Sequence, residues 1–303
     1  MLIAILSRVK RKFVFLLVFL FILSFFLIWS ISLAVNKKTE VDFLSVGQGD
    51  AILIKSKYGQ DILIDGGGNN SITQRLSEEM PWLDKTIDLA IISHPHEDHI
   101  VGQVEALRKF FIGKVLYTGI DFSSPSYEAW KKEIAKQKIP LVIIDKKQRI
   151  NLGPDSYLEI LYPEESLAGK EIKNLNNSSM VVRFVEADKS FLFVGDIERE
   201  VEERLIKVGI NLHADVLKAG HQGSDTSSGE EFLKKVQPKY AVIEVGENKF
   251  GHPSPRVIKR LKRLGAEVFR TDLDGTVRFL VDGESKTIIP GERSLSSVIP
   301  GER

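Results

Sequence analysis

The segment Ser93-His94-Pro95-His96-Glu97-Asp98-His99 places three imidazoles and two carboxylates within six positions. It follows an apolar run at 89–92 that reads as a buried strand, and it precedes a predicted amphipathic helix. A loop at the end of a strand can turn His94 and His96 to one side, while Asp98 and His99 on the first helical turn reach an adjacent point. This density favours a catalytic metal site over a solvent-facing loop with coincidental histidines.

Composition narrows the chemistry of that site. The 303 residues include no cysteine, which excludes disulfide scaffolds, thiolate metal sites and cysteine nucleophiles. Any metal must therefore be held by imidazole and carboxylate, ligands that Zn, Mn and Fe accept. Without residues 1–35, the chain has 38 basic and 41 acidic residues, a formal charge of −3. The body thus lacks the overall positive charge of a tight non-specific nucleic-acid binder.

The N-terminus suggests a membrane location. A basic segment at 1–12 precedes an uncharged run at 13–35, which as a helix is long enough to cross a bilayer. We predict a single-pass anchor that contacts lipid, with a cytoplasmic N-terminus and the body outside the cytoplasm, because basic residues are more numerous before the span than after it. The alternative is secretion after cleavage of a signal peptide near Ser32-Leu33-Ala34.

Downstream of a short joint at 36–40, residues 41–289 read as one α/β domain, followed by a polar tail at 290–303. The expected strands lie at 41–46, 51–56, 61–64, 89–92, 114–117, 141–144, 158–161, 180–185, 191–194, 215–219, 240–245 and 277–281. Helical spacing of apolar residues predicts helices at 100–111, 125–137, 198–208, 230–236 and 255–264.

The His-x-His-x-Asp-His pattern resembles the signature of the metallo-β-lactamase fold hydrolases, whose fold is a four-layer αββα sandwich. Within that group the chain is most similar to the hydrolase domain of ComEC-type competence proteins. The similarity covers about residues 40–282 and rests on motifs in the family's order: Val46-Gly47-Gln48-Gly49-Asp50-Ala51, Leu63-Ile64-Asp65-Gly66-Gly67, Val194-Gly195-Asp196, 216–224, Gly251-His252-Pro253 and Arg270-Thr271-Asp272.

The resemblance implies the metal ligands. His94 and His96 would hold one divalent ion, Asp98, His99 and His221 a second, and Asp196 would bridge the two through its two oxygens. The ions would be Zn or Mn, one or two in number. Family members usually have a further histidine before the bridging aspartate, but residues 100–195 contain none, which leaves the first ion with fewer ligands.

Other motif residues are predicted to support the site or to contact substrate. Asp65 could orient a ligand histidine by accepting its second ring proton, and Gln48 and Asp50 could shape the same side, although a tight turn also explains that motif. His252 could contact substrate or donate a proton to the leaving group, with an exposed loop histidine as the alternative. The candidate substrate contacts are Lys218, Ser224 and Asn177, for which a solvated lysine and a turn serine are equally good explanations of the first two.

The resemblance implies a metal-dependent phosphodiesterase or nuclease, with DNA or a small phosphodiester as substrate. The cations would lower the pKa of bound water towards about 7 and generate the attacking hydroxide, with Asp98 in the catalytic group, so no protein nucleophile is needed. Two alternatives remain: hydrolysis of another ester or amide, and a non-catalytic membrane-tethered binding module. The sequence indicates no protein partner.

Overall fold

The computed structural model describes residues 12, 14–27, 38–282 and 287–290. The chain divides into two compact units, Met1–Lys38 and Thr39–Arg303. The candidate site residues all belong to the second unit.

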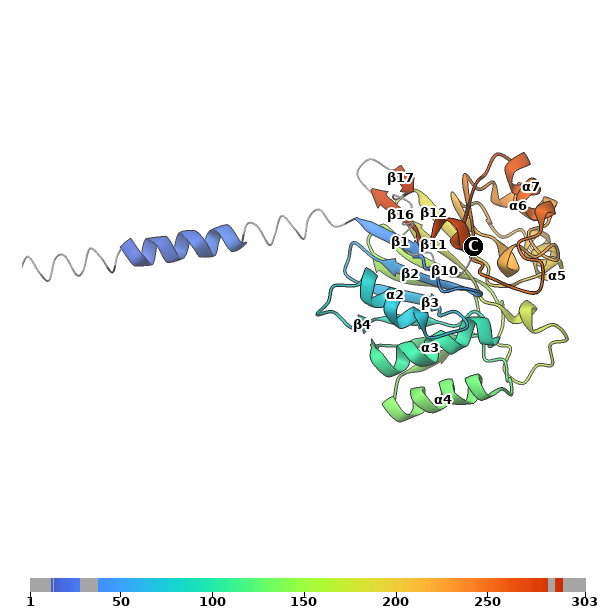
Figure 1. Ribbon diagram of the computed structural model, residues 1–303, viewed down its shortest axis with the longest axis horizontal. Helices are drawn as coiled ribbons and strands as arrows, with labels where there is room; N and C mark the ends of the chain where they lie inside the picture. The colour runs from blue at the N-terminus through green and yellow to red at the C-terminus, as the bar shows by residue number, and fades with distance from the viewer. Residues whose placement is uncertain (1–11, 13, 28–37, 283–286, 291–303) are drawn as a thin grey trace, which may run out of the picture. The chain divides into compact units, whose positions relative to one another are not determined.

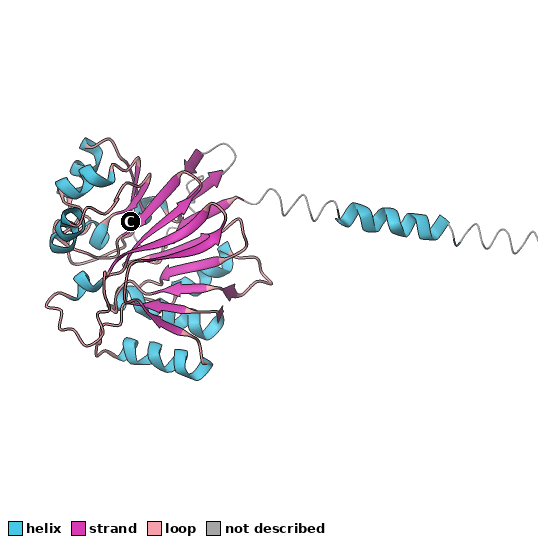
Figure 2. Ribbon diagram, turned by 180° about the vertical axis from the view of Figure 1, so that it is seen from behind, coloured by secondary structure: helices cyan, strands magenta, loops and turns pink. Residues whose placement is uncertain are grey.

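Two large β-sheets form the centre of the second unit (Figures 1 and 2). In the described residues the first sheet has eight strands in the order β17-β16-β1-β2-β3-β5-β7-β8. Its strands are β1 Thr39–Phe43, β2 Ala51–Lys55, β3 Asp61–Asp65, β5 Leu89–Ile91, β7 Val115–Tyr117, β8 Leu141–Ile143, β16 Val277–Asp282 and β17 Thr287–Pro290. The run from β3 through β5 and β7 to β8 is parallel, and the remaining pairs are antiparallel.

The second sheet has seven strands in the described residues, in the order β15-β14-β13-β12-β11-β10-β9. They are β9 Gln148–Gly153, β10 Ser156–Tyr162, β11 Val181–Glu186, β12 Lys189–Phe193, β13 Val216–Lys218, β14 Tyr240–Ile243 and β15 Glu267–Arg270. Strands β12 to β15 run parallel, and a two-stranded ladder of β4 Thr86–Ile87 and β6 Phe111–Ile112 lies apart.

Apolar side chains fill the space between the two sheets. Phe43 and Phe279 from the first sheet contact Phe191 and Phe193 from the second, with ring centroids about 6 Å apart. Parallel strands are buried on both faces when helices cover their outer sides. The outer faces accordingly carry two further apolar clusters, one beneath each helical layer.

Helices cover both outer faces, which completes the αββα sandwich expected from the sequence (Figure 2). The helices on the first sheet are α2 Ser71–Glu79, α3 Glu97–Lys109 and α4 Pro125–Gln137, and those on the second are α5 Arg199–Lys207, α6 Glu230–Val236 and α7 Pro255–Arg263. Ser124 caps α4 by accepting from Tyr127 N at 3.2 Å, and Pro125 occupies the first turn. Short helical turns are η1 Leu175–Ser178, η2 Gly220–Gly223 and α8 Thr271–Asp274.

Sequence periodicity missed the elements with a weak apolar pattern. Helix α2 was not predicted, because only Ile72 and Leu76 of its nine residues are apolar and buried. Strand β9 alternates half-buried and exposed positions, so it has no apolar run, and β15 has four residues, two of them charged. The edge strand β17 closes the first sheet beyond β16 and was not predicted either.

The prediction of a transmembrane anchor is wrong, and the single-pass location falls with it. Within the described part of the chain, no helix combines the length and the apolar character that crossing a bilayer requires. The described helical residues 14–27 extend about 21 Å at the usual rise, short of a hydrocarbon core of about 30 Å. The remaining parts of the predicted N-terminal and C-terminal segments fall on residues 1–11, 13, 28–37 and 291–303, which lie outside the described residues.

Close backbone contacts fix where α3 begins. Gly102 in α3 packs against Gly66 at the end of β3, where a Cβ on Gly102 would lie 1.7 Å from the Gly66 carbonyl oxygen. The Gly66 N–H donates to His99 O, and the Gly102 N–H donates to Gly67 O, both at 2.9 Å. Glycine at both positions therefore allows the N-terminal half of α3 to lie against the end of the first sheet.

Candidate metal centre

The ring nitrogens of His94 and His96 face each other in the loop between β5 and α3. His94 Nε2 lies 2.9 Å from His96 Nδ1, and His94 is fully buried. Ser93 donates its hydroxyl proton to Asp65 at 2.7 Å, so its oxygen accepts from His94 Nδ1 at 3.1 Å. Ser179 Oγ lies 3.2 Å from the same Nδ1. With the proton on Nδ1, His94 presents the lone pair of Nε2 towards His96.

His99 occupies the first turn of α3 and is also fully buried. Its Nδ1 lies 3.0 Å from Asp65 Oδ2, and its Nε2 lies 3.3 Å from Asp196 Oδ2 and 3.8 Å from Asp98 Oδ1. Burial opposes protonation of His99, but the carboxylates led by Asp196 outweigh burial and raise its pKa well above the usual value. Asp65 thus fixes the ring so that Nε2 points to Asp196.

Asp196 follows β12 and carries the carboxylate at the centre of the cluster. His94, His99 and Asp196 form a buried group whose ligand atoms all lie within 4.8 Å of one another. Burial opposes ionisation of Asp196, but His99 and Lys218 overcome that effect and hold its pKa well below the usual value. The Lys218 ammonium donates to Asp196 Oδ1 at 3.3 Å. Oδ2 of Asp196 thus faces His99 and His221, while Oδ1 accepts from Lys218, and a bridge between two ions through both oxygens stays a prediction.

Lys218 is a buried structural cation rather than a solvated or substrate-facing lysine. Its side chain is 1% exposed, and its ammonium pairs with Asp50 and donates to Gly195 O at 2.8 Å. Burial opposes protonation, but Asp50 and Asp196 raise the pKa of Lys218 above its usual value. The prediction of Lys218 as a substrate contact is therefore wrong, because carboxylates surround its charge within the protein.

His221 and Gln222 reach the site from η2, which follows β13. Both residues have a φ of 49°, in the left-handed region that costs a non-glycine residue about 1–2 kcal/mol. Such strain is concentrated where the structure must aim a side chain. His221 Nε2 lies 3.9 Å from Asp196 Oδ2, and His221 Nδ1 lies 3.4 Å from Glu198 Oε1.

The Gln222 amide lies between the two acidic ligands. Its Nε2 donates to Asp98 Oδ2 at 2.8 Å and to Asp196 Oδ2 at 3.2 Å. Gln48 donates in turn to Gln222 Oε1 and accepts from Gly246 N at 3.1 Å. On the side of the centre formed by Asp98 and His221, the Gln222 amide therefore donates to carboxylate oxygens that could otherwise coordinate a cation.

The donor set fits a divalent cation. Burial, then the charge of His99, holds the pKa of His94 well below its usual value, and burial also lowers that of His96. Both imidazoles are therefore neutral, the form that binds metal. The two facing nitrogens, with the ionised Asp196 beside the cluster, would hold the ion, and His99, Asp98 and His221 lie on its other side. Nitrogen and oxygen donors of this kind suit Zn, Mn or Fe.

His252 lies at the outer side of the centre. Its ring centroid is 5.2 Å from that of His221, and the side chain is partly buried. Burial, followed by the proximity of His221, lowers the pKa of His252 below its usual value. The ring is therefore neutral at neutral pH, and its predicted contact with substrate or with the leaving group stays a prediction.

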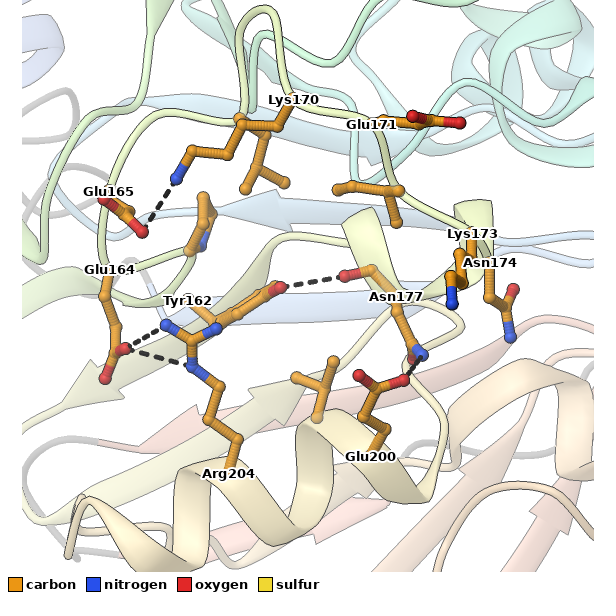
Figure 3. Close-up of a pocket in the computed structure, with 14 residues that line it drawn as sticks. Tyr162, Glu164, Glu165, Lys170, Glu171, Lys173, Asn174, Asn177, Glu200 and Arg204 are labelled. Atoms are coloured by element: carbon orange, nitrogen blue, oxygen red, sulfur yellow. Dashed lines mark hydrogen bonds and ion pairs between the residues drawn. The ribbon is translucent and has the colours of Figure 1, made fainter.

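Ser224 and Asn177, two of the predicted substrate contacts, form hydrogen bonds within the protein. Ser224 is 4% exposed, and its hydroxyl oxygen lies 3.1 Å from Thr226 Oγ1, so it is a buried turn serine. Asn177 donates to Glu200 Oε2 at 3.2 Å and accepts from Glu198 N at 2.9 Å. Asn177 lines a cavity of about 400 Å³ next to α5, in which Arg204 pairs with Glu164 and Lys170 with Glu165 (Figure 3).

Sequence reasoning missed several residues that hold the ligands. Asn176, not Asn177, approaches the site, with its Nδ2 at 3.4 and 3.5 Å from the His221 ring nitrogens and 3.2 Å from Glu198 Oε1. Ser179 lies against His94 and accepts from Asp196 N at 3.0 Å. The available signal was the stretch Asn176-Asn177-Ser178-Ser179, four adjacent hydrogen-bonding residues directly before the apolar run at 180–185.

Comparison with known proteins agrees with this geometry. Residues 44–246 match the model of the metallo-beta-lactamase superfamily. ComE operon protein 3 of Bacillus subtilis is 32% identical over 80% of this chain and 33% of its own length. Competence protein ComA of Neisseria gonorrhoeae is 30% identical over 80% of this chain and 32% of its own length. The chain thus spans about a third of the length of the curated relatives it matches.

The fold likeness extends to solved structures. The metallo-beta-lactamase fold protein YhfI of Bacillus subtilis aligns with a TM-score of 0.51 at 14% identity, covering 84% of this chain and all of that one. At this identity the similarity concerns the fold alone. The family match and the curated relatives, together with the converging histidines and aspartates, identify the chain: it belongs to the metallo-beta-lactamase superfamily as a metal-dependent hydrolase related to competence proteins.

Proposed function

We propose that this chain is a metal-dependent phosphodiesterase that cleaves single-stranded DNA or a smaller phosphodiester. The observation that carries the proposal is the pair of facing nitrogens on His94 and His96, 2.9 Å apart beside a cluster containing His99 and the ionised Asp196. The similarity to competence proteins supports the phosphodiester class. DNA transport is not included, because the chain spans about a third of those relatives.

Different residues of the chain would position the ligand histidines and contact the substrate. When bound, a divalent cation supplies a Lewis acid and water that is acidic enough to react at neutral pH. Ser93 and Ser179 fix the ring of His94, and Asp65 fixes that of His99, so the ligand nitrogens are already aimed before the cation binds. The neutral imidazole of His252 faces the substrate side of His221 and can hydrogen-bond to a phosphate oxygen.

The test uses the full-length chain with Mn or Zn supplied separately. We expect cleavage of a single-stranded oligonucleotide and of a small phosphodiester, and Asp98→Ala should reduce kcat/KM at least about a hundredfold. Loss of a group that only positions a ligand costs about 10–100-fold, so loss of a ligand should cost more. No turnover from the folded, metal-loaded chain would overturn the proposal and favour another ester or amide, or a binding role.

A matched control lies in the same motif. Glu97 precedes Asp98 on the first turn of α3, but its side chain is exposed and accepts from Ser126 Oγ at 3.2 Å, away from the centre. Glu97→Ala should retain activity within about twofold. An equal loss in both variants would mean that Asp98→Ala acts through the helix and not through the metal site.

A further inference from the structure

An exposed aromatic ring stands beside the candidate metal centre. Phe250 lies in the loop between β14 and α7, and its side chain is 75% exposed, although a phenylalanine usually loses water contact on folding. The neighbouring Lys249 is also exposed. An apolar ring that remains in water next to a site suggests a surface for a ligand.

The loop that carries Phe250 is held by one side chain. Asn248 donates from Nδ2 to Gly246 O at 2.9 Å and to His252 O at 2.8 Å. Its Oδ1 accepts from Phe250 N at 3.1 Å and from His252 N at 3.0 Å. These four hydrogen bonds fix the backbone on both sides of Phe250, so the ring does not depend on a partner for its position.

Three rings form a row that leads from the centre to solvent. His221, which approaches Asp196, lies 5.2 Å from His252, and His252 lies 5.9 Å from Phe250 with the two ring planes only 27° apart. The rings of His252 and Phe250 therefore stack, whereas the ring of His221 meets that of His252 edge-on at 66°. Phe250 is the last ring of the row and is exposed to water. A flat aromatic group next to the scissile bond of a substrate would extend this stack.

We propose that Phe250 is the stacking subsite for a nucleobase that flanks the phosphodiester at the metal centre, with Lys249 beside it for a neighbouring phosphate. This inference rests on the proposed phosphodiesterase function and narrows its substrate to nucleotide-containing phosphodiesters. Stacking suits single strands of any sequence, because every base has a π-face. It also compensates for a body without overall positive charge, which gains little affinity from phosphates alone.

The experiment compares a deoxydinucleotide with the same molecule in which one base is replaced by an abasic sugar. Full-length chain loaded with Mn should cleave the base-bearing compound with a kcat/KM about tenfold or more above that of the abasic one. Phe250→Leu should lose this preference, and Phe250→Trp should keep it. Phe111→Leu, a change at a ring that is 70% exposed on β6, is the matched control and should leave the preference unchanged.

Two results would overturn the inference. One is equal cleavage of both compounds by the unaltered chain, and the other is a retained preference in folded Phe250→Leu. If the unaltered chain cleaves neither compound, the proposed function fails first. Fluorescence anisotropy then decides on the subsite, because labelled single-stranded DNA should bind Phe250→Leu about tenfold more weakly than it binds the unaltered chain, and equal binding would refute it.

Discussion

The two sides of the metal centre are held by different means. On one side, the serine hydroxyls of Ser93 and Ser179 lie against Nδ1 of His94 and leave its Nε2 aimed at His96. On the other side, the Gln222 amide donates to the carboxylates of Asp98 and Asp196. The first side is preorganised for a cation, whereas the second satisfies its carboxylates within the protein. Similar ligand motifs therefore need not give two equal sites.

The largest effect on stability should come from removing the Lys218 ammonium, which pairs with Asp196 between the two sides. Lys218→Met removes a buried ammonium and leaves Asp50 and Asp196 without its charge, which should lower the free energy of unfolding by about 3–5 kcal/mol. Urea unfolding measures the loss. The exposed Lys207→Met is the control. Adding Asp50→Asn to Lys218→Met should restore part of the stability, and a double variant as unstable as the single one would contradict this account.

The loop after η2, on the second side, should respond to pH. Glu202 is 2% exposed and accepts from Ser228 N and, at 2.8 Å, from Gly229 N. Burial raises its pKa from 4.5 to about 7, despite these hydrogen bonds. Between those values the folded chain binds more protons than the unfolded chain, so this group makes stability fall as pH rises, by about 3 kcal/mol in all.

Glu202→Gln should remove that slope. The difference in unfolding free energy between the unaltered chain and the variant should change by about 3 kcal/mol from pH 4.5 to pH 7, as measured by urea unfolding at several pH values. Glu203→Gln, at an exposed neighbouring position, should follow the unaltered chain throughout. Parallel pH curves for Glu202→Gln would show that the carboxyl titrates in its ordinary range.

A smaller effect should separate positioning from folding on the first side. Ser179→Ala removes the oxygen that lies against His94 and accepts from Asp196 N, so metal affinity should fall about 10–100-fold. Titration calorimetry with Zn or Mn measures the change. Ser178→Ala is the control, because that buried hydroxyl donates to Leu175 O and lies against no ligand. Equal metal affinities in the two variants would mean that the Ser179 hydroxyl does not help to position His94 for the metal.

The smallest effect on metal affinity should come from placing an additional histidine on the second side. Gln222→His replaces an amide donor by an imidazole at a left-handed position that histidine tolerates better than most residues. We expect the weaker of two cations to bind about tenfold more tightly in this variant. Gln222→Leu, which removes the donor without adding a ligand, separates the two causes. An unchanged metal titration in Gln222→His would show that the amide does not limit the second side.

Much of this arrangement could be predicted from the sequence, because local patterns encode it. The family resemblance carried by the motif at 94–99 and the later motifs implied the sandwich. The residues predicted for helices 125–137 and 230–236 coincide with α4 and α6. Asp98 and His99 fall on the first turn of α3, as the spacing predicted.

The remaining features depend on contacts between distant segments. The burial of Lys218 results from Asp50 on the other sheet, and no local pattern distinguishes it from a solvated lysine. The approach of Asn176 to His221 spans 45 positions, and that of Ser179 to His94 spans 85. The Gln222 amide can donate to Asp98 only after the two sheets have packed together, so its role could not be predicted from the local sequence.

The sequence separation of the ligands has a consequence for the growing chain. Asp98 and Gln222 meet across 124 positions, and Asp196 and His221, which follow β12 and β13, are synthesised long after the first histidines. Contacts of such separation form late in folding, and domains emerge from the ribosome N-terminus first. A cation that needs Asp196 as well as His94 and His96 could therefore bind only after most of the domain has been translated.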